Sequence, residues 1–195
     1  VFENEKVIDQ YQTNFGIRTI RFDANKGFFL NGKNIKIHGT NNHQDHAGIG
    51  AAMPDALQEF RIQTLKDFGI NAYRCSHNPP TPELLDVCDR LGMLVIDENR
   101  LLGVSSTHFN YMKRFMLRDR NHPSVISWSI ANEEWGVEGN ELGAKLATTL
   151  QAFTKSIDTT RAITAAISGG WQKGISWIPI LHKVRATYNN RPWWR

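Results

Sequence analysis

The chain has 195 residues, of which 41% are hydrophobic and 22% are charged, so it is long enough to bury a core of its own. This composition is ordinary for a globular protein and excludes collagen-like, low-complexity and intrinsically disordered classes. No apolar run approaches the roughly 18 residues that a membrane span requires, so we expect no membrane span.

The net charge of +4 first suggests a nucleic-acid or membrane-surface partner, but the charge is unevenly distributed. Five basic residues and no acidic residue follow Trp171: Lys173, Lys183, Arg185, Arg191 and Arg195. The rest of the chain holds 18 basic and 19 acidic residues and is almost neutral. We therefore expect no nucleic-acid partner. We expect a soluble protein and leave its compartment open between cytoplasm and periplasm.

The first part of the chain carries the signals of β-hairpins. From Phe15 to Phe22, apolar residues alternate loosely with polar ones. Asn31-Gly32 then lies between the apolar runs 28–30 and 35–37. Asn-Gly between short apolar runs predicts a type I′ turn, because both central residues of that turn need positive φ.

From about Asn34 onward, short apolar strands alternate with helices. Strands are predicted over 35–39, 70–74, 93–97, 125–131 and 161–166, and helices over 54–68, 82–91, 109–120 and 138–157. Thr81-Pro82 supplies an N-cap and a proline at the first helical position, and Gly92 ends the same helix. This alternation predicts a parallel sheet, in either a doubly wound or a barrel fold.

In the first of these helices, helical spacing predicts which residues face the core. They are Leu57, Phe60, Ile62, Leu65 and Phe68, with Gly69 as the stop signal.

Polar or aromatic residues follow each of the five predicted strands. The clusters are 41–46, 74–79, 97–100, 132–135 and 168–171. Any one cluster could be a capping or turn device. Together they predict a site, because functional groups of parallel α/β folds assemble at the carboxyl ends of the strands.

Two chemistries suit these groups. One is metal binding by a set of five side chains: His43, Asp45, His46, His77 and Glu98. Their spacing lacks the helical i, i+4 geometry of zinc proteases. The other is carboxylate acid–base work on a sugar, whose hydroxyls need polar partners and whose apolar face suits an indole. Trp135 and Trp171 are the candidate stacking platforms.

Several stretches resemble the catalytic barrel of glycoside hydrolase family 2, the β-galactosidase and β-glucuronidase group. They are Gly39-Thr-Asn-Asn-His-Gln-Asp-His46, Asn71-Ala-Tyr-Arg-Cys-Ser-His-Asn-Pro79, Val95-Ile-Asp-Glu-Asn99, and Arg118-Asp-Arg-Asn-His-Pro-Ser-Val125 running into Trp128-Ser-Ile-Ala-Asn-Glu133. Residues 1–23 resemble the last strands of the immunoglobulin-like sandwich that precedes this barrel.

The resemblance implies an α/β fold: a partial (β/α)8 TIM barrel of about five βα units, preceded by a β segment of the sandwich. The implied division is residues 1–26 for the end of the sandwich and 27–176 for the partial catalytic barrel. Residues 177–195 form an atypical basic tail that fits no part of the family pattern.

The resemblance also implies roles for individual residues. Glu133 matches the general acid/base, and Asn132 the residue that binds the sugar 2-hydroxyl. Arg74 would orient carboxylates, while His43 and His77 match sugar-contacting positions. The remaining candidate site residues are Trp171, as a stacking platform, and Glu98.

Glu98 matches an active-site carboxylate that also binds Mg²⁺ in some members. Here it is followed by Asn-Arg-Leu-Leu-Gly103 instead of the pattern of the metal-binding members. We therefore expect no required cofactor, and Glu98 remains the only candidate metal ligand.

A retaining glycosidase also needs a carboxylate nucleophile. No Asp or Glu follows Asp158, and Asp158 is predicted at the wrong edge of the sheet. A complete barrel takes about 250 residues. We therefore expect a truncated or frame-shifted chain, with a genuine alternative C-terminus left open.

The predicted function is that of a β-galactosidase-like retaining glycosidase fragment with little or no hydrolysis. It would act on a β-linked sugar or oligosaccharide. The alternative is a non-catalytic carbohydrate-binding remnant. An unpaired sheet edge makes a homo-oligomer possible.

Overall fold

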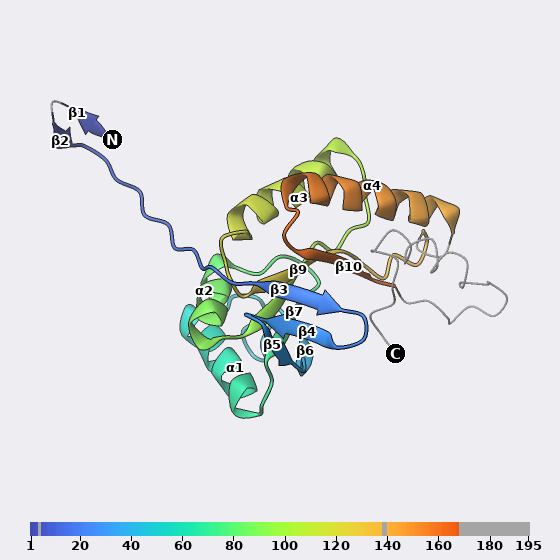
Figure 1. Ribbon diagram of the computed structural model, residues 1–195, viewed down its shortest axis with the longest axis horizontal. Coiled ribbons are helices and arrows are strands. Elements are labelled where there is room, and N and C mark those ends of the chain that lie inside the picture. The colour runs from blue at the N-terminus through green and yellow to red at the C-terminus, as the bar shows by residue number, and fades with distance from the viewer. Residues whose placement is uncertain (4, 138–139, 168–195) are drawn as a thin grey trace.

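The computed structural model describes residues 1–3, 5–137 and 140–167 (Figure 1). Its centre is a sheet of five parallel strands, β6 (Gly39–His43), β7 (Ala72–Ser76), β8 (Leu94–Glu98), β9 (Val125–Asn132) and β10 (Ala162–Ala166). The helices between them are α1 (Asp55–Asp67), α2 (Pro82–Leu91), α3 (Ser106–Asp119) and α4 (Glu141–Ile157). This is the alternation that the sequence predicts. No helix in these described ranges is long and apolar enough to cross a membrane.

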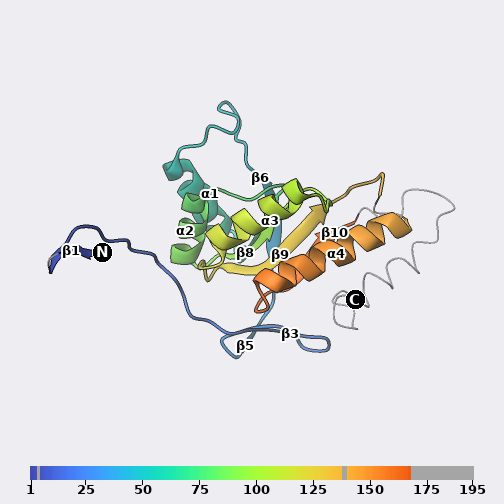
Figure 2. The same cartoon turned by 90° about the horizontal axis from the view of Figure 1, so that it is seen from above.

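The strands lie in the sheet in chain order, from β6 at one edge to β10 at the other, and every neighbouring pair is parallel. A doubly wound sheet reverses its strand order at a switch point, whereas a barrel wall adds each strand on the same side. The observed order therefore favours a barrel wall. The helices cover one face of the sheet, with α1 beside α2 and α3 beside α4 (Figures 1 and 2).

The first parallel strand differs from its prediction over 35–39. The structure places Ile35 at the end of β5 (Lys33–Ile35) and starts β6 only at Gly39. The sequence of β6 is Gly-Thr-Asn-Asn-His, which contains no large aliphatic residue, so apolar periodicity cannot locate it. The polar residues expected after this strand, Asn41 to His43, therefore lie within it.

Helix α1 also departs from the predicted pattern. Ile62 is fully buried, but Phe60 and Phe68 are 61% and 81% exposed. At about 100° per residue, Phe60 lies on the opposite side of the helix from Gln58, which is buried. Gln58 Oε1 accepts a hydrogen bond from the Thr81 hydroxyl at 3.1 Å. Thr81 thus holds the N-cap position of α2 without capping it through its side chain.

The N-terminal strands form two small antiparallel sheets. One is the ribbon of β1 (Phe2–Glu3) and β2 (Lys6–Val7), and the other contains β3 (Ile20–Asp23), β4 (Gly27–Leu30) and β5. The predicted turn at Asn31-Gly32 is confirmed, since both residues have positive φ, 49° and 77°. The predicted domain boundary after residue 26 falls in the turn between β3 and β4 and remains a prediction.

The sheet β3–β4–β5 closes the amino end of the parallel sheet. Phe28 of β4 packs in one cluster with Ala72, Leu94 and Ile126, which lie at the first or second residue of their strands. Figure 2 shows this small sheet lying away from helices α1 and α2. The opposite, carboxyl end of the parallel sheet remains available for a site.

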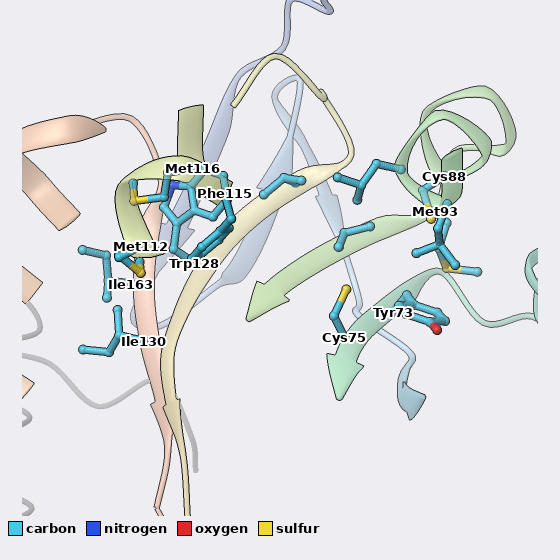
Figure 3. Packing of buried hydrophobic residues seen from close by; sticks show 14 of the residues in the cluster. Tyr73, Cys75, Cys88, Met93, Met112, Phe115, Met116, Trp128, Ile130 and Ile163 are labelled. Atoms are coloured by element: carbon cyan, nitrogen blue, oxygen red, sulfur yellow. The ribbon is translucent and has the colours of Figure 1, made fainter. Parts of the chain in front are cut away.

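The main core fills the space between the parallel sheet and the helices (Figure 3). Trp128 of β9 is fully buried and meets Phe115 of α3 edge-on, with ring centroids 5.6 Å apart. Cys75 and Cys88 are buried free thiols in the same core. All eight residues of β9 are buried, as expected for a strand covered on both faces.

A buried ion pair anchors the amino end of β10. Asp158 Oδ2 accepts hydrogen bonds from Trp128 Nε1 at 2.9 Å and from Arg161 Nη1 at 2.7 Å. Burial by itself would raise the pKa of Asp158. Hydrogen bonds from Thr160, Trp128 and Arg161 outweigh that effect and hold this pKa well below its usual range.

We predict that Asp158→Asn lowers the free energy of unfolding by about 3 kcal/mol at pH 7, because it leaves the buried Arg161 without its anion. A depressed folded pKa gives stability that is present above the unfolded pKa near ~4 and is lost as the pH falls. The deficit of the variant should therefore shrink in acid. Urea unfolding at pH 7 and at about pH 2.5, well below the unfolded pKa, measures this deficit, with the exposed Asp67→Asn as control. An equal deficit at both pH values would contradict the pKa assignment.

Candidate active site

Side chains from three neighbouring strands meet at the carboxyl end of the parallel sheet. Arg74 lies on β7, Glu98 ends β8 and Asn132 ends β9. In the sheet register, Arg74 is opposite Ile96, and Glu98 is opposite Ser129. The convergence expected from the clusters after the strands is therefore present for these residues.

Glu98 is the centre of this cluster and is fully buried. Its Oε2 accepts hydrogen bonds from Arg74 Nε at 2.9 Å, from Arg74 Nη2 and from the Ser129 hydroxyl at 2.8 Å. Its Oε1 lies 2.8 Å from His77 Nδ1. A buried carboxylate is costly unless it is paired and hydrogen-bonded, and these contacts supply both kinds of compensation.

The same arginine orients Asn132. Arg74 Nη2 donates to Asn132 Oδ1 at 2.7 Å, so the carbonyl end of the amide faces Arg74 and its NH2 group faces away. The backbone N–H of Asn132 donates to Arg100 O at 2.9 Å and fixes the end of the strand. The Asn132 amide can therefore offer donors to a ligand.

Two histidines stand beside this network. The rings of His43 and His77 are perpendicular, with centroids 5.0 Å apart. His77 follows a cis peptide bond from Ser76. Arg61 of α1 holds the end of β6 by donating to His43 O at 3.0 Å and to Asp45 O at 3.3 Å. Both predicted sugar-contacting histidines thus lie at the same edge as Glu98.

Among the described residues, the five side chains of the metal hypothesis do not come close enough together to share one ion. Within the described ranges, one group of three or more potential ligand residues is close enough to share an ion, and it consists of Asp86, Asp89 and His122. That group includes none of the five proposed ligands. In it, His122 Nδ1 lies 2.7 Å from Asp89 Oδ2.

The donors around Glu98 also fail to fit a magnesium ion. Mg²⁺ binds oxygen ligands and retains several waters. Glu98 already pairs with the Arg74 guanidinium and the His77 ring, so an ion there would have to displace a cationic or neutral nitrogen donor. We therefore assign no step to a metal at this carboxylate.

Glu133 leaves the sheet directly after Asn132. Its φ of 47° turns the chain out of β9, its side chain is exposed, and its N–H donates to Ala166 O at 3.0 Å. Glu134 instead lines a small cavity with Ala131 and Ala166, beside α4. Adjacent glutamates thus have different surroundings.

The last acidic residue of the sequence lies away from this cluster. Asp158 follows α4 and precedes β10, at the amino end of the sheet and away from Glu133, as predicted. Trp171, the predicted stacking platform, lies outside the described residues.

Sequence reasoning missed Ser129, which donates to Glu98. The register of β8 with β9 would have identified Ser129, because it places Ser129 opposite Glu98. That register cannot be read from a single sequence.

Asp97 is a second buried carboxyl on β8, on the other face from Glu98. It is fully buried, and neither of its oxygens accepts a hydrogen bond from the described residues. Burial raises the pKa of Asp97 well above its usual range, and the nearby Asp119 carboxylate, itself held by Arg118, adds to the effect. A protonated Asp97 can donate to Asp119, which makes the pair compatible with burial.

We predict that Asp97→Asn raises the melting temperature by about 3 °C at pH 7, because the amide replaces the neutral acid without a proton to lose. A raised folded pKa gives stability that is present below the unfolded pKa and is lost as the pH rises. The difference in melting temperature between the variant and the wild type should therefore grow from about pH 5 to pH 8. Asp119→Asn, which leaves Arg118 unpaired, should destabilise throughout. A destabilised Asp97→Asn protein at every pH would refute a neutral Asp97.

Comparison with known families shows the family to which the chain belongs. The family model for "Glycosyl hydrolases family 2, TIM barrel domain" matches residues 23–110 and 103–188. The chain belongs to glycosyl hydrolase family 2. The family 2 match continues past Ser176, where the sequence alone suggested that the resemblance ends.

The chain is also similar to individual family 2 proteins. The chain is 39% identical to "Beta-galactosidase BoGH2A" of Bacteroides ovatus, over 85% of this chain and 24% of the relative. It is 36% identical to a β-glucuronidase of Rattus norvegicus, over 82% of this chain and 26% of the relative. A crystal structure of a family 2 member from Bacteroides cellulosilyticus matches with a TM-score of 0.83 at 37% identity, over 95% of this chain and 24% of that one. The chain spans about a quarter of the length of these relatives.

Proposed function

We propose that this chain carries the acid/base half of the active site of a retaining β-glycosidase. The main observation in support is the cluster of Arg74, Glu98 and Asn132 at the carboxyl end of the parallel sheet. Glu133 directly follows Asn132 in the sequence. Catalytic groups of barrel enzymes come from this end of the strands. Membership of family 2 supports the reaction class.

In this proposal Glu133 acts first as an acid and then as a base. It protonates the glycosidic oxygen as the bond to the anomeric carbon breaks, and later takes a proton from the attacking water. Its exposed position at the end of β9 leaves room for the leaving group and for water. Glu98 is less suited to this role, because its oxygens already accept from Arg74, Ser129 and His77.

The sugar would lie over the donors beside Glu133. Asn132, with its NH2 directed away from Arg74, is suited to bind the 2-hydroxyl. His43 and His77 would contact other hydroxyls, and Arg74 would orient the carboxylates. Trp171 would add a stacking surface. The sugar we propose is a β-galactoside, and the β-glucuronidases among the relatives make β-glucuronides the alternative.

The second carboxylate of a retaining site must lie roughly 5–5.5 Å from the first. The sequence contains no Asp or Glu after Asp158, and Asp158 lies at the opposite end of the sheet. We therefore place the nucleophile outside these 195 residues, in a length that the larger relatives possess. The five strands would then form part of an eight-stranded barrel, and residues 1–23 the end of a preceding sandwich.

A carbohydrate-binding role without catalysis is the second candidate. It is favoured by one observation: the donors that would hold a sugar are together, while Glu98, the carboxylate at their centre, is already paired with Arg74 and His77. Both candidates require that the chain bind a β-glycoside, and they differ in whether Glu133 would act as acid and base once a nucleophile is supplied.

We predict that the 195-residue chain hydrolyses 4-nitrophenyl β-galactoside at the buffer rate, because loss of a covalent catalyst costs about 10⁴-fold or more.

Binding of this galactoside to the chain should remain measurable by NMR titration. Glu98→Gln should weaken it about tenfold or more by releasing Arg74 and Asn132, whereas Glu134→Gln, beside the site, should not.

A 4-nitrophenolate release assay on the wild type and on Glu133→Gln completes this test. Turnover that Glu133→Gln abolishes would contradict the proposed absence of the nucleophile. Absence of any binding to β-galactosides and β-glucuronides would contradict the sugar site itself.

A further inference from the structure

An exposed indole lies two residues after the proposed acid/base. Trp135 is 73% exposed, whereas Trp128, in the strand that leads into the same loop, is fully buried. A large apolar ring held in water gives no stability to the fold. In the loop beside Glu133, its exposed face is accessible to a ligand.

The backbone fixes Trp135 close to Glu133. The Trp135 N–H donates to Glu133 O at 3.0 Å, and the Glu133 N–H is held by Ala166 O at 3.0 Å. The φ of 47° at Glu133 directs the loop out of the sheet at this point. The two residues therefore lie in one tight turn at the carboxyl end of β9.

A neighbouring loop brings a second apolar side chain to this region. The Asn132 N–H donates to Arg100 O, so the segment after β8 runs beside the end of β9. The next residue in that segment, Leu101, is 44% exposed. Exposed apolar residues from two loops thus lie near the same turn.

The chemistry of the proposed reaction indicates which part of the substrate an apolar residue in this loop would contact. A general acid must reach the glycosidic oxygen within about 3 Å, and that oxygen joins the sugar to its leaving group. The sugar is assigned to the Arg74 and Asn132 side of Glu133. A leaving group on the far side of the acid from these donors would leave toward solvent, and the described turn next to the acid is the one that carries Trp135.

We propose that Trp135 is a specificity-determining residue that stacks against the leaving group of a β-glycoside. The ligand chemistry is a flat apolar face, which both an aryl ring and the face of a second sugar ring provide. This inference rests on the proposed function, because it places the leaving group relative to Glu133.

The test compares matched ligands on the full 195-residue chain by NMR titration. The probes are the methyl β-glycosides and 4-nitrophenyl β-glycosides of galactose and of glucuronic acid, and the two disaccharides in which either sugar is β-1,4-linked to glucose as the leaving group. Wild type should bind a 4-nitrophenyl glycoside or the disaccharide about tenfold more tightly than the methyl glycoside. If only the 4-nitrophenyl glycoside binds more tightly than the methyl glycoside, the preferred leaving group is aromatic. If the disaccharide also binds more tightly, the leaving group is a sugar.

Substitutions then test whether Trp135 causes the tighter binding of these ligands. Trp135→Ala should reduce the aryl-to-methyl ratio to within about twofold while leaving the methyl glycoside affinity unchanged, and Trp135→Phe should keep most of the ratio. Phe60→Ala, which removes an exposed aromatic ring from α1, should behave as wild type. Because Trp135 is exposed, its variants should keep the wild-type melting temperature.

Two results would overturn the inference in distinguishable ways. A ratio that persists in Trp135→Ala refutes the stacking role and leaves the sugar site intact. Failure of every glycoside to bind wild type refutes the sugar site and, with it, the assignment of the leaving group.

Discussion

A carboxylate removed from water is the constraint on which the site depends. Glu98 is fully buried, and burying an uncompensated charge costs several kcal/mol. Its partners Arg74 and Ser129 come from the strands on either side, and His77 comes from the loop after β7. Their meeting requires the correct register of three strands. The register of the sheet and the geometry of the site are therefore set by the same contacts.

Strand β8 satisfies two neighbouring buried carboxyls by different means. Glu98 faces the donor cluster and is compensated by a guanidinium, a hydroxyl and an imidazole. Asp97 faces the helices, where Arg118 is already paired with Asp119. Burial and that anion raise its pKa, so a retained proton takes the place of a cation. The alternation of a strand thus separates an ionic network from a neutral acid in adjacent residues.

Much of the fold could be predicted because its signals are local. The boundaries of α2 were predicted from Pro82 and Gly92, and the turn at Asn31-Gly32 from its need for positive φ. Strand β6 could not be predicted from periodicity, since its residues are polar and small. The exposure of Phe60 was also missed, because Gln58 occupies the buried face through its bond to Thr81.

The sequence by itself determined the order of strands and helices and the residue types collected at the carboxyl ends of the strands. These properties depend on neighbours within a few positions. Only the tertiary structure decided that Arg74 contacts both Glu98 and Asn132, which are 24 and 58 residues away, and that Ser129 completes their network. Contacts at such separations depend on strand register and on the cost of burying Glu98 unpaired, and neither quantity is encoded in a local pattern.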